Sequence, residues 1–227
     1  METFILIHGA FSGGWTWGKV VPFLEKEGYN VIAPDMPGHG KKRNMSPEHV
    51  TMQSYVDTIV DILDKEPEPV ILVGHSMGGM VISQVAEHRP SKIKRLIYVC
   101  AFLLKNGESL HSRGGGRHSP LAASYEAFKE LMCADCSDAD ARWVRTLMVP
   151  PPGNLAGTVV HVTPENYGRI PRYYIECLSD KAIPPPVQKQ MYTETPCKRI
   201  LSMNSSHFPL ISAPEELAKN LITLSTT

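Results

Sequence analysis

One short segment limits what this 227-residue chain can fold into more than any other. The aliphatic run VILV at 70–73 has the composition of a strand covered on both faces, and GHSMG at 74–78 follows it directly. Residues 77–88 then have the spacing of apolar side chains that is typical of a helix. A serine on such a strand-to-helix turn has a strained backbone, and the flanking glycines let the strand and the helix approach closely. The pattern predicts that the hydroxyl of Ser76 projects from the edge of a parallel sheet.

The same alternation of short apolar runs and helical periods continues along the chain. We expect further strands at 4–8, 30–34, 96–102, 173–177 and 199–203, and further helices at 15–27, 51–65, 184–192 and 214–224. The expected fold class is therefore α/β, with a mostly parallel central sheet and helices on both faces. Because the carboxyl ends of parallel strands share one edge of the sheet, the loops that follow the strands should gather there.

Residues 105–170 do not show this alternation of strand and helix patterns. They are rich in Gly, Pro, Ser and acidic residues, and their helical stretches fall at 121–132 and 139–149. We predict a core formed by 1–104 and 171–227, with a small inserted cap or lid at 105–170.

Composition excludes several classes of function. Lys and Arg number 23 against 23 Asp and Glu, so the chain has no basic surface for nucleic acid or for anionic lipid. No stretch approaches the roughly 18 consecutive apolar residues of a membrane span. The five cysteines are odd in number and scattered, which favours a reducing compartment, and the apolar run FILI at 4–7 is too short for a signal peptide. We expect a cytoplasmic protein.

A serine hydroxyl is a weak nucleophile at neutral pH and needs a base, which in turn needs an acid to orient it. His207 is the one histidine that follows the last expected strands, and Asp180 follows the strand at 173–177. The order Ser76, Asp180, His207 is the one that this sheet topology imposes. Glu176 is a rival acid, but it lies within the strand.

The tetrahedral intermediate of such a reaction needs backbone N–H donors that are already in place. Met77, which follows the serine, offers one of them at the start of its helix. We expect the second from the glycine-rich loop after the first strand, with Ala10 as the first choice and Phe11 as the next.

Large apolar side chains in the cap and in the loops could line a pocket for the substrate. Equally, they could serve only to pack the cap against the core. The candidates for substrate binding are Phe11, Phe128, Leu131, Trp143, Leu147 and Phe208. The C-x-x-C at 133–136 lacks a second pair of ligands at a suitable spacing, so we expect no metal site.

Several of these motifs, taken together, resemble those of a known protein superfamily. HGA at 8–10, PDMPGHG at 34–40, GHSMGG at 74–79 and the loops of Asp180 and His207 resemble the α/β-hydrolase superfamily. HGAFSGGWTW at 8–17, DKAIP at 180–184 and HFP at 207–209 resemble the plant methylesterase and hydroxynitrile lyase group and its bacterial esterase relatives. The resemblance spans both halves of the expected sheet and implies a serine hydrolase without a cofactor, with Ser76, Asp180 and His207 as its triad and Ala10 and Met77 as its oxyanion hole.

The resemblance also bears on the choice between two reactions. Lyases of this group carry Thr before the oxyanion residue and Lys directly after the catalytic histidine, where this chain has Gly9 and Phe208. We therefore expect an esterase that cleaves small, fairly apolar esters through an acyl-serine intermediate. A hydroxynitrile lyase and a receptor without catalytic activity remain the alternatives. The expected partner is a small-molecule ester, and the oligomeric state stays open, a homodimer being one option.

Overall fold

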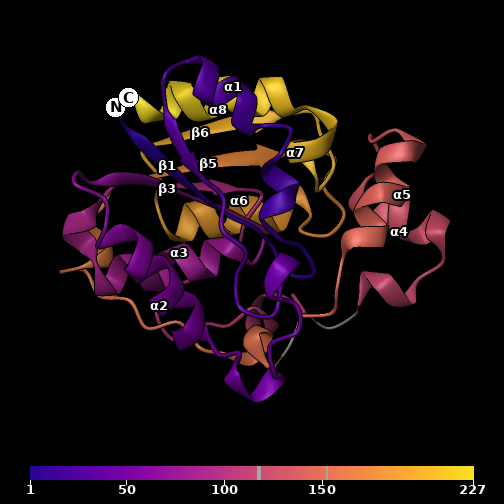
Figure 1. Ribbon diagram of the computed structural model, residues 1–227, viewed down its shortest axis with the longest axis horizontal. Helices are drawn as coiled ribbons and strands as arrows, with labels where there is room; N and C mark the ends of the chain where they lie inside the picture. The colour runs from indigo at the N-terminus through magenta and orange to yellow at the C-terminus, as the bar shows by residue number, and fades with distance from the viewer. Residues whose placement is uncertain (117–118, 152) are drawn as a thin grey trace.

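Six parallel strands form one sheet in the computed structural model, which describes residues 1–116, 119–151 and 153–227 (Figure 1). Their spatial order is β2-β1-β3-β4-β5-β6. The strands are β1 (Thr3–Ile7), β2 (Asn30–Ile32), β3 (Val70–His75), β4 (Ile93–Val99), β5 (Arg172–Cys177) and β6 (Arg199–Met203). The strand order reverses between β1 and β3, and in such sheets ligands bind beyond the carboxyl ends at this point. The predicted parallel sheet is confirmed.

Helices cover both faces of the sheet, as predicted. Figure 1 shows α1 (Val21–Lys26) and α8 (Pro214–Ser225) on one face, and α2 (Met52–Leu63), α3 (Gly78–His88) and α6 (Pro185–Glu194) on the other. The short α7 (Pro209–Ser212) follows β6. Among the described residues, no helix combines the length and the apolar character needed to cross a membrane.

The hydrophobic core lies in two layers, one on each face of the sheet. Side chains of a strand alternate between the faces, so Ile5 and Ile7 of β1 pack in the cluster beneath α2 and α3. Phe4 and Leu6 pack in the other cluster, beneath α1 and α8. All four side chains are fully buried, which explains why the strand is a continuous apolar run.

Two local predictions need correction. The helix expected at 15–27 is divided into a 3₁₀ turn and α1, because Pro22 lies in the first turn of α1 and its ring would clash with the carbonyl four residues before it. The strand expected at 96–102 is β4 and lies three residues earlier; it ends before Cys100, which has a left-handed φ of 34°. The sequence predicts no element at α7, because its four residues are too few to show a helical period.

Single turns of 3₁₀ helix fill much of the remaining chain. They lie at Gly14–Trp17, Gly40–Lys42, Pro47–His49, Pro90–Lys92, His111–Arg113, Pro120–Ala122, Leu155–Gly157 and Tyr167–Arg169.

The segment predicted as a cap holds α4 (Tyr125–Met132) and α5 (Asp138–Leu147), which Figure 1 shows beside each other and apart from the helical layers. Serine side chains cap both helices. Phe128 of α4 packs in the cluster of α1 and α8, whereas Leu155 packs in the opposite cluster. Residues 117–118 and 152 of this segment lie outside the described residues. The division into core and cap stays a prediction.

Candidate active site

Ser76 occupies a tight turn between β3 and α3, with a φ of 54°. A Cβ atom on Gly74 would lie 2.6 Å from the backbone of Gly78, and a Cβ on Gly78 would lie 2.7 Å from the carbonyl oxygen of Ile7. The two glycines are therefore required for the close approach of strand and helix that the sequence predicts. Residues forced to positive φ cluster at functional sites, and Phe11 and Cys100, the other such non-glycine residues in the described chain, follow β1 and β4.

A chain of hydrogen bonds joins the three side chains that the sequence singled out. Nε2 of His207 lies 3.0 Å from the Oγ of Ser76, and Nδ1 of His207 lies 2.7 Å from the Oδ2 of Asp180. Because the carboxylate can only accept, Nδ1 carries the ring proton, and Nε2 is free to accept the hydrogen of the serine. The three residues follow β3, β6 and β5, whose carboxyl ends share one edge of the sheet.

Asp180 is almost completely buried, and its carboxylate is held on both oxygens. Oδ1 accepts hydrogen bonds from the backbone N–H groups of Ala182 at 2.8 Å and Ile183 at 2.9 Å. This leaves Oδ2 for His207. The rival acid Glu176 instead accepts hydrogen bonds from Tyr192 and Ser202.

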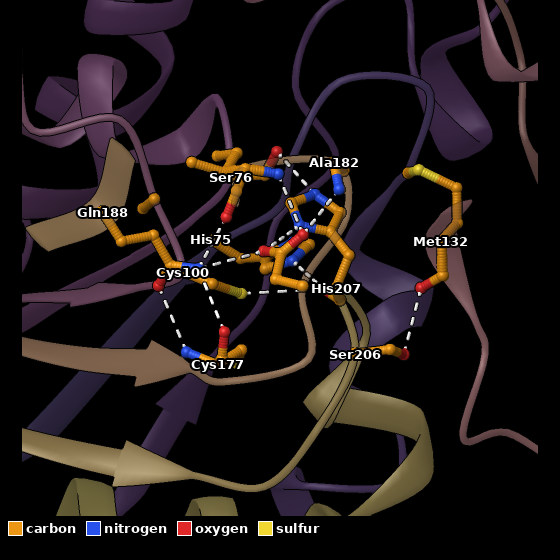
Figure 2. A network of polar contacts seen from close by, with 12 residues as sticks. His75, Ser76, Cys100, Met132, Cys177, Ala182, Gln188, Ser206 and His207 are labelled. Carbon is orange, nitrogen blue, oxygen red and sulfur yellow. Dashed lines mark hydrogen bonds and ion pairs between the residues drawn. The ribbon is translucent and has the colours of Figure 1, made fainter. Parts of the chain in front are cut away.

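The backbone of His207 is also fixed. Its carbonyl oxygen accepts a hydrogen bond from Nε2 of His75 at 2.8 Å and a weaker one from the Sγ of Cys100 at 3.6 Å (Figure 2). Burial, and after it the neighbouring His207, lowers the pKa of His75 well below its ordinary value. His75, Cys100 and His207 are the one set of possible metal ligands that the described residues bring together. Both ring nitrogens of His207 are already engaged, and we assign no metal to the set.

The loop after β1 lies beside Ser76 because β1 and β3 are neighbours in the sheet. Two buried histidines hold this loop. Nδ1 of His8 donates to the carbonyl oxygen of Gly9, while its Nε2 accepts from the N–H of Met36. Nδ1 of His39 donates to the carbonyl oxygen of Ser12. The loop that carries the predicted oxyanion residue is therefore fixed at both ends.

The two histidines that hold this loop are neutral at physiological pH. Burial, assisted by the neighbouring His39, lowers the pKa of His8 to about 3. Burial also lowers the pKa of His39 to about 4. In the unfolded chain both would take up a proton below about pH 6.5.

We expect the stability of the protein to fall as the pH drops from 6.5 towards 4. In this window the unfolded chain binds protons that His8 and His39 cannot bind in the folded state, so each lowers the free energy of unfolding by at most about 1.4 kcal/mol per pH unit. Urea unfolding at pH 7.5 and 5.5 measures the effect. His39→Gln should weaken this acid sensitivity and His88→Gln, at an exposed position, should not; equal sensitivity in both variants would contradict the assignment.

A cavity of about 510 Å³ opens beside Ser76 and His207. Ala10 and Met77, the predicted oxyanion residues, lie in its wall. Apolar side chains form most of the remaining wall, among them Phe11, Phe102, Leu110, Leu131, Leu155 and Ile183.

Of the six residues predicted to bind substrate, Phe11 and Leu131 line this cavity and the other four do not. Phe128 is fully buried in the core, and Phe208 is buried against the rings of His75 and His207. Trp143 is 41% exposed and packs on the ring of Trp15. Leu147 lines a separate surface hollow that includes Lys41. The position of these four side chains gives their predicted role no support, and Phe11 and Leu131 stay the candidates for substrate binding.

The cavity residues that the sequence did not reveal come mainly from irregular segments. Residues 110–116 and 153–156 contribute walls, yet neither segment has the period of a helix or a strand. The one available signal was the glycine triplet at 114–116, because glycines without an evident turn role often mark a place where the backbone approaches another group closely. A Cβ on Gly115 would lie 2.5 Å from the ring of Phe102.

Comparisons with known proteins identify relatives that match nearly the whole chain. A pyrethroid hydrolase from Sphingobium wenxiniae is 37% identical over 238 residues, covering 95% of this chain and 84% of that protein. Methylesterase 9 of Arabidopsis thaliana is 28% identical over 254 residues, covering 99% of this chain and 98% of that protein. The crystal structure of a pyrethroid hydrolase from Sphingobium faniae superposes with a TM-score of 0.88 at 31% identity, covering 100% of this chain and 98% of the other.

The chain spans 63% of the length of a longer chloroplastic relative in Arabidopsis thaliana, to which it is 30% identical. The predicted resemblance to plant methylesterases and bacterial esterases is confirmed. A profile of the alpha/beta hydrolase family matches residues 4–220. The chain belongs to the alpha/beta hydrolase family.

Proposed function

We propose that the protein is a carboxylic-ester hydrolase that uses Ser76 as its nucleophile. The observation that carries the proposal is the buried chain of hydrogen bonds from Asp180 through His207 to Ser76, which ends at the wall of an apolar cavity. The names of the relatives support the same class of reaction, since they include a pyrethroid hydrolase, a carbendazim hydrolyzing esterase and methylesterases.

The reaction would proceed in two halves. In the first, Nε2 of His207 takes the proton from Ser76 as Oγ attacks the ester carbonyl carbon, and then gives that proton to the leaving alcohol as the C–O bond breaks. In the second, His207 takes a proton from water as the water oxygen attacks the acyl carbon, and it then gives that proton to Oγ of Ser76 as the acyl–Oγ bond breaks and the acid leaves. Asp180 stays ionised and stabilises the imidazolium, and the N–H groups of Ala10 and Met77 stabilise the oxyanion.

The lining of the cavity supports small, neutral and fairly apolar esters as substrates. Among the described residues it contains no Lys, Arg, Asp or Glu, so a charged substrate would lose its hydration without gaining a partner. The same feature disfavours the lyase alternative. At the position after His207 the buried ring of Phe208 offers no cation for a departing cyanide ion.

Two assays test the reaction class. The first compares aryl esters of increasing acyl length and methyl esters of aromatic acids with a cyanohydrin. The esterase proposal expects ester turnover above cyanide release, and the reverse result would favour the lyase. The second incubates the protein with a fluorophosphonate, which should label Ser76 and abolish turnover; a receptor would bind ligand without being labelled.

We place the protein in the cytoplasm. All five cysteines are free thiols, and four of them are buried. A reducing compartment keeps thiols in this state.

A further inference from the structure

We propose that Gln188, on α6, is a positioning residue for the reaction: it clamps the turn that carries Asp180 and thereby holds the acid and one wall of the cavity in place. The inference rests on the proposed function, because Gln188 would act through Asp180 and His207. It concerns a residue that does not line the cavity and that the sequence did not single out.

Gln188 is fully buried, which is unusual for a side chain with so strong a need for hydrogen bonds. It shares the buried face of α6 with Met191, whereas the neighbouring Gln190 is exposed. A buried amide is destabilising unless its donors and acceptor are all satisfied. Its contacts therefore show what the side chain does.

The amide of Gln188 binds both ends of the turn from Cys177 to Ile183. Its Oε1 accepts from the N–H of Cys177 at 3.1 Å, and its Nε2 donates to the carbonyl oxygens of Cys177 at 3.2 Å and Ile183 at 2.7 Å. Figure 2 shows Gln188 and Cys177 facing each other. The partners also fix which atom is which, because a backbone N–H requires the oxygen and two carbonyls require the NH₂ group.

The turn that Gln188 clamps contacts the carboxylate of Asp180 and also forms part of the cavity wall. Through its backbone, the N–H groups of Ala182 and Ile183 hold the Oδ1 of Asp180. Through their side chains, the same two residues form part of the cavity wall. Nε2 of Gln188 also lies 3.4 Å from the Oδ2 of Asp180, the oxygen that accepts from His207. Loss of the clamp would therefore release the acid and the wall together.

Only an amide fits this position. Methionine has a similar length but would remove the bonds to the N–H of Cys177 and to the carbonyl oxygen of Ile183. The carbonyl oxygen of Cys177 would keep the N–H of Asp180, at 3.3 Å. A carboxylate could accept from Cys177 but would face the carbonyl oxygens and the carboxylate of Asp180. A protonated carboxyl could replace one of the two donated bonds. The activity of Gln188→Glu should therefore depend on the protonation of the new carboxyl group. If residue 188 only filled space, its protonation would not affect the activity.

The first test measures kcat and KM of Gln188→Met on an aryl acetate. We expect kcat to fall about 10² fold, the size of effect produced by small misplacements of a reacting group, with KM changed less than threefold. Gln190→Met, two residues away on the exposed face of the same helix, is the matched control and should behave as the wild type.

The second test uses the pH profile of Gln188→Glu. It shows whether Gln188 positions the turn of Asp180 even if Gln188→Met fails to fold. The groups that face position 188 are Asp180 directly, His207 beyond it, and the thiols of Cys177 and Cys100 at the ends of β5 and β4. Burial and the charge of Asp180 favour the protonated carboxyl at low pH. We expect kcat/KM to decline as the pH rises from 6 to 8, while circular dichroism stays unchanged and Gln190→Glu shows no such decline.

The outcomes separate this inference from the function on which it rests. Wild-type kcat and a wild-type pH profile in both Gln188 variants, with Ser76→Ala inactive, would overturn the clamp and leave the esterase intact. An active Ser76→Ala would overturn the function itself. Loss of kcat in Gln188→Met together with the declining limb in Gln188→Glu would support the clamp.

Discussion

Replacing Ser76 with Ala should lower kcat for an aryl acetate by about 10⁴ to 10⁶ fold. The substitution removes the atom that would form the proposed acyl intermediate, and leaves only the cavity and the proposed oxyanion hole to promote hydrolysis by water. KM should change little, because the apolar wall remains. The fold should persist, since within the described part of the chain the side chain of Ser76 makes one hydrogen bond, that to His207. Stopped-flow and steady-state kinetics measure the effect, with labelling by a fluorophosphonate as an independent readout.

Ser179→Ala is the matched control for this experiment. Ser179 lies in the turn next to Asp180 but is exposed, and the one hydrogen bond of its hydroxyl to a described residue is to Asn204, at 3.5 Å. Its replacement should leave kcat within about twofold of the wild type, as expected for a surface substitution. Wild-type turnover by Ser76→Ala would contradict the assignment of the nucleophile, whatever the behaviour of the control.

The contacts among Ser76, Asp180 and His207 could be predicted from the sequence because the order of the strands, and not the detailed packing, brings these residues together. Ser76 has a local signature in which an aliphatic strand, a glycine-flanked turn and a helix follow one another. Asp180 and His207 need only the knowledge that residues after parallel strands meet at one edge of the sheet. The sheet order then brings β5 and β6 next to each other, and the two side chains follow them directly.

The walls of the cavity could not be predicted in the same way. Phe128 and Trp143 are large and apolar in amphipathic helices, but a helical period reveals which residues share a face and not what that face meets. Phe128 meets the core, and Trp143 meets Trp15. Leu110 and Leu155 line the cavity from segments without a period. Gln188 gave no signal either, since glutamine is ordinary on the exposed face of a helix and its burial here depends on how α6 lies against the sheet.

Asp180→Asn should lower kcat by about 10⁴ fold with a small change in KM, because Asp180 does not line the cavity. The structure dictates how the new amide would lie. The N–H groups of Ala182 and Ile183 occupy one oxygen of Asp180, so the amide oxygen must take that place. The NH₂ group is then left facing Nδ1 of His207. It can only donate there, which moves the ring proton to Nε2 and removes the acceptor that Ser76 needs.

Glu176→Gln is the control for Asp180→Asn, since Glu176 is the other acid near the end of β5. It contacts Tyr192 and Ser202 and no residue of the proposed triad, so its replacement should leave kcat within a few fold of the wild type. Circular dichroism of both variants verifies that the fold is retained. A large loss in Glu176→Gln with wild-type activity in Asp180→Asn would transfer the role of the acid to Glu176. Equal losses in both would mean that stability, and not the orientation of His207, limits turnover.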